Sequence, residues 1–221
     1  MEEFIRWSLE YDMWCKMQFF GKAIGNADRG DEEVFRQRGP QNLLEITANL
    51  PLMLEAMQSF PNYQPVIAGA PGIDEEFYAP YINKGAKIIF GKTYDLLNNA
   101  HAALVTSGTA TLETALFNVP QIVCYATPMA KIYSWLKRHF LKVKYVSLVN
   151  LITDRESVKE LIAADMTVEK IKDELREILP ADSKRRAAIL EEYNRMKDIL
   201  GKPGASERAA EKIVFLLKNP Q

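Results

Sequence analysis

The segment richest in potential chemistry spans residues 105–113 and reads Val-Thr-Ser-Gly-Thr-Ala-Thr-Leu-Glu. An apolar run precedes it and a helical pattern follows, which predicts a position between the carboxyl end of a strand and the start of a helix. Free backbone N–H groups and the positive end of the helix dipole favour a phosphate there. Gly108 lets a ligand approach the backbone, and the hydroxyls of Ser107, Thr109 and Thr111 can donate to phosphate oxygens.

Glu113 lies a turn further along the same pattern and adds an acceptor of the kind that binds a vicinal diol, such as a ribose. The same residues also fit an ordinary capped helix. Ser107 or Thr109 would then be the N-cap, and Glu113 would be a favourable charge in an early turn. Spacing alone leaves both interpretations open.

A second polar segment, residues 145–156, contains Asn150, Arg155 and Glu156 in a predicted loop between a strand and a helix. Arginine can pair with a diphosphate, and asparagine can contact a base or a sugar amide. The alternative is a surface loop with an ion pair between Arg155 and Glu156.

Residues 131–144 form a third segment, which we name the basic aromatic segment. Trp and Tyr beside Lys and Arg are typical of a surface that faces anionic lipid headgroups. A helix that covers the sheet with its apolar face and leaves its basic face in water fits equally well. The segment contains no acid, and its basic residues are Lys131, Lys137, Arg138, Lys142 and Lys144.

Other patterns for cofactor or metal chemistry fail. Residues 91–93 read Gly-Lys-Thr, but the glycine that a Walker A loop needs is replaced by Ala86, and no GxGxxG occurs. The two cysteines, Cys15 and Cys124, are far apart and have no Cys/His cluster around them, so we expect no zinc site and no bound metal from them. His101 is interpreted as a residue at the start of a strand rather than as a base.

The elements that must position these residues alternate between strand and helix. Apolar runs predict strands at 65–70, 87–90, 102–106, 121–125 and 145–148, and amphipathic patterns predict helices at 50–60, 75–81, 94–100, 109–117 and 129–140. This alternation is typical of an α/β fold with a doubly wound, Rossmann-like parallel sheet. After residue 148 we expect only helices, at 168–179, 183–200 and 206–217.

Composition limits the remaining choices. The 221 residues are 48% hydrophobic and 26% charged, which excludes a disordered chain and fits a globular fold. No apolar run is long enough to span a bilayer, and the acidic start of the chain is unlike a signal peptide. With a net charge of −1 and one local basic excess, the chain does not fit a general nucleic-acid binder. Residues 1–45 form an atypical leader without assigned structure, and residues 46–221 form the predicted domain.

Several of these motifs occur together in one known family. Residues 106–113, Pro120, residues 145–151 with Arg155 and Glu156, and residues 203–210 resemble, in this order, lipid-A-disaccharide synthase. The resemblance runs from about residue 45 to residue 217 and corresponds to the carboxyl-terminal half of that family. It implies one half of a GT-B fold, which has two Rossmann-like halves.

The resemblance also implies a function. Enzymes of this family are inverting glycosyltransferases that transfer 2,3-diacylglucosamine from its UDP derivative to lipid X, which is 2,3-diacylglucosamine 1-phosphate. The products are UDP and the β-1,6-linked disaccharide of lipid A. No cofactor is implied. The chain would be cytoplasmic and peripheral on the inner face of the cytoplasmic membrane, with the basic aromatic segment near the lipid.

Carried over by position, the resemblance assigns the UDP diphosphate to Ser107, Gly108, Thr109 and Thr111. It assigns the ribose to Glu113, and it places Asn150, Arg155 and Glu156 in the same nucleotide site.

The sequence departs from the family at two points. Residues 41–44 stand where the family has a Gly-Ser-Arg loop, and the amino-terminal half with its acceptor site and catalytic groups has no counterpart. We therefore expect weak UDP binding and slow or no turnover by the chain alone. A homodimer or a separately encoded amino-terminal half would be the partner. Alternatives are a non-catalytic UDP-binding remnant or subunit, or a UDP-N-acetylglucosamine 2-epimerase-like enzyme.

Overall fold

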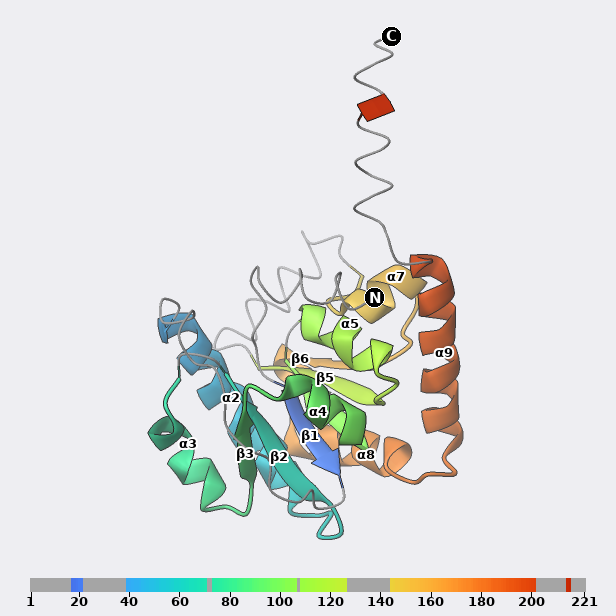
Figure 1. The fold of residues 1–221 in the computed structure, drawn as a ribbon. Helices are drawn as coiled ribbons and strands as arrows, with labels where there is room; N and C mark the ends of the chain where they lie inside the picture. The colour runs from blue at the N-terminus through green and yellow to red at the C-terminus, as the bar shows by residue number, and fades with distance from the viewer. Residues whose placement is uncertain are drawn as a thin grey trace.

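The computed structural model describes residues 17–21, 39–70, 73–106, 108–126, 144–201 and 214–215. Within these residues lies one six-stranded sheet with the strand order β3-β2-β1-β4-β5-β6 (Figure 1). All neighbouring strands are parallel except β1, which is antiparallel to both β2 and β4. The expected doubly wound α/β architecture is confirmed. The strands are β1 (Met17–Gly21), β2 (Gln64–Gly69), β3 (Lys87–Phe90), β4 (Ala102–Val105), β5 (Gln121–Tyr125) and β6 (Lys159–Ile162).

Helices cover both faces of this sheet, with α4 and α5 in front and α8 behind in the view of Figure 1. The alternation of side chains along a strand explains how β4 serves both layers. Its Ala103 and Val105 pack in a cluster with Leu97 of α4, whereas its Leu104 packs in a second cluster with Met53 of α2. The helices are α2 (Gly39–Met57), α3 (Glu75–Ile82), α4 (Thr93–Asn99), α5 (Gly108–Leu116), α7 (Leu148–Thr153), α8 (Val168–Ile178) and α9 (Lys184–Leu200), with a 3₁₀ turn at Ala163–Asp165.

The central strand β1 comes from the segment for which the sequence predicted no structure. Without it, β2 and β4 would each have an unpaired edge inside the sheet, and buried unpaired backbone groups are costly. The run Met-Gln-Phe-Phe-Gly at 17–21 is rich in aromatic residues, which suit a strand. The expectation that every strand is parallel is therefore wrong at this one position. The boundary expected after residue 45 also passes through helix α2.

The region after β5 differs from expectation in two further elements. Residues 145–148 do not form a strand; instead, Ser147 caps α7 by accepting a hydrogen bond from the backbone N–H of Asn150. The strand at this edge of the sheet is β6, whose sequence Lys-Glu-Leu-Ile has only two apolar residues. A run so short and half charged carries little strand signal.

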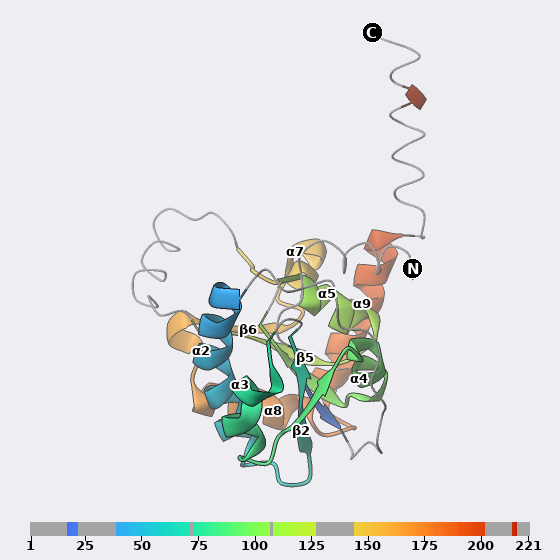
Figure 2. The same cartoon turned by 60° about the vertical axis from the view of Figure 1, so that its left-hand side comes forward.

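The helices near the carboxyl end agree with the predicted ones at 168–179 and 183–200. Tyr193 anchors α9, since its hydroxyl donates to the carbonyl of Val119 (3.1 Å) and accepts from Nε2 of Gln121 (3.0 Å). In Figure 2, α2 and α3 lie to the left of the sheet and α9 lies to its right. The helices predicted at 129–140 and 206–217 lie outside the described residues, apart from Val214 and Phe215, which are helical.

Candidate nucleotide-binding site

The segment singled out first occupies the predicted place in the fold. Strand β4 is fully buried, and α5 begins at Gly108, three residues after the strand ends. Because β4 and β5 are parallel, this helix starts at the carboxyl-end edge of the sheet, where ligands bind in open α/β folds. Gly108 and Thr109 lie in the first turn of α5, and Ser107 lies outside the described residues.

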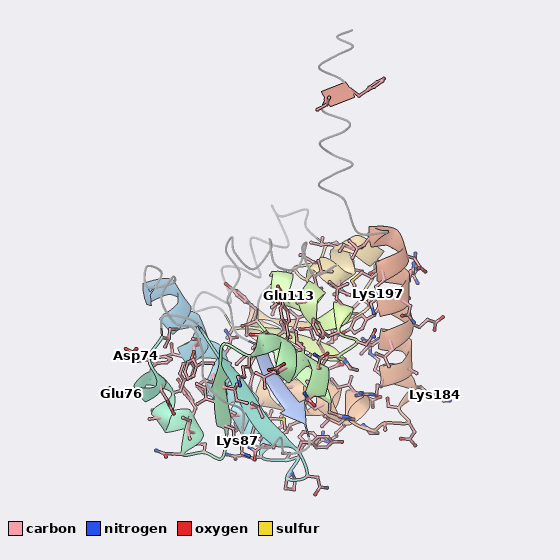
Figure 3. The ribbon with its side chains drawn as sticks, in the orientation of Figure 1. Asp74, Glu76, Lys87, Glu113, Lys184 and Lys197 are labelled. Carbon is pink, nitrogen blue, oxygen red and sulfur yellow. The ribbon has the colours of Figure 1, made fainter. Side chains whose placement is uncertain are left out.

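Glu113 is the acid with the most unusual surroundings at this edge. Its side chain is only 5% exposed, and no hydrogen-bond partner is present for its Oε1 among the described residues. Burial raises the pKa of Glu113 to about 7, because a charged carboxylate loses its hydration without a compensating partner. Figure 3 shows Glu113 on α5, whereas the exposed Asp74 and Glu76 lie out at α3.

Tyr94 lies against the same face of α5 and was not predicted as a site residue. Its ring stacks on Phe117, with 5.4 Å between centroids and 13° between planes. Its hydroxyl is buried and has no hydrogen-bond partner among the described residues. Burial, and to a smaller extent the charge of Glu113, raises the pKa of Tyr94 to about 12. The sequence signal was a tyrosine at the start of the helix that follows β3, at the same edge of the sheet.

Thr111 joins α5 to the start of α7. Its side chain is completely buried, and its Oγ1 accepts a hydrogen bond from the backbone N–H of Leu148 (3.2 Å). Its carbonyl accepts from Nε2 of Gln121 (2.9 Å). Thr111 therefore holds the turn before α7 against the first turns of α5.

Asn150 is equally buried, and both ends of its amide are bonded to the protein. Its Nδ2 donates to the carbonyl of Val158 and to Oε1 of Glu160, and its Oδ1 accepts from the backbone N–H of Val158, each at 2.9 Å. Glu160 also accepts from the backbone N–H groups of Val146 and Ser147. These bonds fix the α7–β6 turn, by which we mean residues 145–160. Glu160 was not predicted as a site residue, because no strand was expected from the sequence at residues 159–162.

Arg155 and Glu156 lie at the other end of this turn. Arg155 pairs with Glu192 of α9 (3.2 Å) and Glu156 pairs with Lys159 (3.1 Å), so the expected ion pair between Arg155 and Glu156 is not the one observed. Lys159 is opposite Ile122, near the start of β5, so these residues lie toward the amino-end edge of the sheet. The structure does not bring them to the N-terminus of α5, which is at the opposite edge.

The remaining candidates are placed as follows. His101 directly precedes β4, and its Nε2 lies 2.6 Å from the carbonyl of Leu179. Residues 41–44, where the family has its Gly-Ser-Arg loop, are helical and belong to α2. The motif at 203–210 and the basic aromatic segment up to residue 143 lie outside the described residues.

Metal ligands are not gathered anywhere in the part of the chain that the structure describes, since no three His, Cys, Asp or Glu residues lie together there. Cys124 is completely buried, and burial raises the pKa of its thiol. No helix among the described residues is both long and apolar enough to cross a membrane.

Comparison with known proteins adds independent information. The family model for lipid-A-disaccharide synthetase matches residues 46–213. A lipid-A-disaccharide synthase of Syntrophus aciditrophicus is 38% identical over 182 residues, which cover 79% of this chain and 47% of that protein. One of Myxococcus xanthus is 36% identical over 180 residues, covering 78% of this chain and 46% of the relative. The chain thus spans about half the length of these curated relatives.

Proposed function

The chain belongs to the lipid-A-disaccharide synthase family, and on that premise we propose that its α/β fold binds the UDP part of a nucleotide-sugar donor. The donor is UDP-2,3-diacylglucosamine and the acceptor is lipid X, as the family name implies. The reaction is inverting transfer of the diacylglucosamine, with release of UDP and formation of the β-1,6 disaccharide of lipid A.

The observation that carries this proposal is the buried carboxyl of Glu113. An ionised carboxylate only accepts hydrogen bonds, and Oε1 of Glu113 has no donor among the described residues. A vicinal diol supplies two O–H donors, so a ribose would satisfy this carboxylate. Glu113 lies in the second turn of a helix that starts at the carboxyl-end edge of the sheet, within reach of a nucleotide whose phosphates lie at the helix start.

The first turn of α5 supplies the diphosphate contacts. We assign these to Ser107, Gly108 and Thr109, through backbone N–H groups and hydroxyls. Thr111 and Asn150 do not contact the nucleotide in this proposal. Their side chains are buried and hydrogen-bonded to the α7–β6 turn, so they hold that turn against α5. In the same proposal Arg155 and Glu156 hold that turn through their ion pairs instead of contacting the nucleotide.

The chemistry divides into two requirements. The acceptor hydroxyl oxygen forms a bond to the anomeric carbon, the bond from that carbon to the UDP oxygen breaks, and UDP leaves with the electron pair. The start of α5 stabilises this departing anion. The acceptor proton must pass to a base, which the resemblance places in the amino-terminal half of the family. We therefore propose that transfer requires the groups of that half in addition to the site described here.

The basic aromatic segment is the proposed contact with the cytoplasmic face of the inner membrane. Its five basic side chains and its aromatic residues match an anionic lipid surface. Co-sedimentation with vesicles that contain anionic lipid, but not with neutral vesicles, is the expected result. Equal binding to both kinds of vesicle would contradict the electrostatic contribution.

Calorimetric titration of UDP tests the nucleotide site. We expect the wild type to bind UDP and Glu113→Ala to bind it at least tenfold more weakly, since the variant loses the diol acceptor. The matched control is Glu169→Ala, on an exposed face of α8. Equal affinity of wild type and Glu113→Ala would show that the ribose assignment is wrong. A transfer assay with lipid X, with and without an added amino-terminal half, tests the second requirement.

A further inference from the structure

The interface between α4 and α5 buries two polar atoms that have no hydrogen-bond partner among the described residues: Oε1 of Glu113 and the hydroxyl of Tyr94. Leaving a buried donor or acceptor unsatisfied is unfavourable, and folded proteins keep few such groups. Two of them on adjacent helices, one an acceptor and one a potential donor, are complementary in chemistry.

The stacking of Tyr94 on Phe117 places the start of α4 beside the end of α5. Phe117 directly follows α5 and donates its backbone N–H to the carbonyl of Glu113, so the two side chains lie one helical turn apart on one stripe. The ring of Tyr94 stacks on Phe117 at 5.4 Å and is nearly parallel to it, which fixes the tyrosine against that stripe. Tyr94 and Phe117 pack against an apolar cluster that includes Leu96, Leu97 and Ala110.

We propose that Tyr94 is a positioning residue for Glu113, and that its hydroxyl donates to the Glu113 carboxylate when a nucleotide is bound. This inference rests on the proposed function, because it assumes that Glu113 accepts the hydroxyls of a ribose. A carboxylate that accepts from a ribose must be ionised, and in this apolar interface it then needs further donors. We assign one of these donors to the Tyr94 hydroxyl.

No cation among the described groups performs this task. Burial is the only cause that shifts the pKa of Glu113, so no positive charge compensates it. The charge of Glu113 is felt at Tyr94, where it raises the pKa of the phenol beyond the effect of burial. The two groups are therefore close enough for the charge on Glu113 to act on the phenol.

A double-mutant cycle on UDP affinity tests the proposal. Tyr94→Phe keeps the ring stacked on Phe117 and removes only the hydroxyl, and we expect it to weaken UDP binding about tenfold. In a Glu113→Gln background the same change should have less than a twofold effect, because the carboxylate on which Tyr94 acts is gone. Tyr81→Phe, which removes the hydroxyl of a buried tyrosine on α3, is the control and should leave the affinity unchanged.

The outcomes separate this inference from the proposed function. An unchanged affinity in Tyr94→Phe, or an equal loss in both backgrounds, would overturn the role of Tyr94 and leave the UDP site intact. Titration with 2′,3′-dideoxy-UDP tests the ribose contact by itself, since the loss caused by Glu113→Gln should disappear with this ligand. If Glu113→Gln weakens UDP and dideoxy-UDP equally, or if the wild type binds neither, the proposed site and the role of Tyr94 both fail.

Discussion

Two neighbouring regions of the molecule bury polar side chains in opposite ways. In the α7–β6 turn, the amide of Asn150 has a protein partner at both ends, and Glu160 accepts from two backbone N–H groups as well as from Asn150. In the α4–α5 interface, Glu113 and Tyr94 each bury an oxygen that has no hydrogen-bond partner within the described residues.

These two kinds of burial imply different roles for the two regions. A satisfied buried network stabilises one conformation, because breaking it leaves several groups unpaired at once. A buried acid without partners reduces stability at neutral pH, and such groups cluster where a ligand or a substrate provides the missing donors. We therefore expect changes in the turn to affect mainly unfolding, and changes in the interface to affect mainly binding and pH dependence.

Removing the amide of Asn150 should give the largest loss of stability. Asn150→Ala leaves the buried backbone N–H and carbonyl of Val158 without their partners, and we expect about 3 kcal/mol less free energy of unfolding. Urea denaturation measures this difference. Asn99→Ala is the control, because its amide bonds only the carbonyl of Asp95 on an exposed helix surface, and it should lose less than about 0.5 kcal/mol. A similarly small loss in Asn150→Ala would mean that this amide is free to contact a ligand.

Replacing Glu113 should instead increase the free energy of unfolding at neutral and higher pH. Burial raises its pKa to about 7 in the folded state, above the ordinary value of about 4.3. The folded state therefore holds the proton more tightly, so this group's contribution to stability is fully present below about pH 4 and is lost as the pH rises through 7. Glu113→Gln should match the wild type near pH 4 and exceed it by about 2 kcal/mol at pH 8.

Thermal or urea unfolding across this pH range measures the effect. Glu169→Gln provides a control of opposite sign, because Lys172 lowers the pKa of Glu169 and its replacement should slightly weaken the fold at neutral pH. Parallel stability curves for wild type and Glu113→Gln would show that the carboxyl of Glu113 is ionised freely in the folded protein.

Nucleotide affinity should depend on the same ionisation. If the ribose binds the carboxylate form, and the pKa of Glu113 is about 7, UDP affinity should rise about tenfold between pH 6 and pH 8. The terminal phosphate of UDP also titrates in this range. The measurement is therefore the difference between wild type and Glu113→Gln, which share the phosphate contribution. If both proteins showed the same pH profile, ionisation of Glu113 would not contribute to UDP binding.

Much of the fold follows from the sequence because the parallel strands β2 to β5 are continuous apolar runs. The two strands that were missed have a common cause, since neither β1 nor β6 carries such a run bounded by clear turns. β1 lies in the sheet because the gap between β2 and β4 needs a strand, and that requirement is visible only in three dimensions. β6 reads Lys-Glu-Leu-Ile, two charged residues followed by two apolar ones, and four positions are too few for a strand period to be recognised.

In the candidate site, too, the features set by local sequence could be predicted and the long-range contacts could not. The position of Gly108 and Thr109 at a strand-to-helix junction could be predicted, since it depends on local order along the chain. The contacts of Tyr94 with α5 and of Glu160 with the turn could not, because they join segments that are distant in sequence. Glu113 was singled out for its chemistry, but its lack of partners depends on the packing of α4.

The smallest effect is expected at Arg155, and it decides how far the nucleotide site extends. The pair between Arg155 and Glu192 is half exposed, so Arg155→Ala should change the free energy of unfolding by about 0.5 kcal/mol. Because Arg155 lies toward the amino-end edge of the sheet, Arg155→Ala should lower UDP affinity less than twofold. Glu192→Gln, which removes the other partner of the pair, should have the same small effects on stability and affinity. Calorimetry on both variants checks this expectation. A tenfold loss of affinity in Arg155→Ala alone would mean that the arginine leaves Glu192 to bind the diphosphate, and the α7–β6 turn would then share in binding as well as in stability.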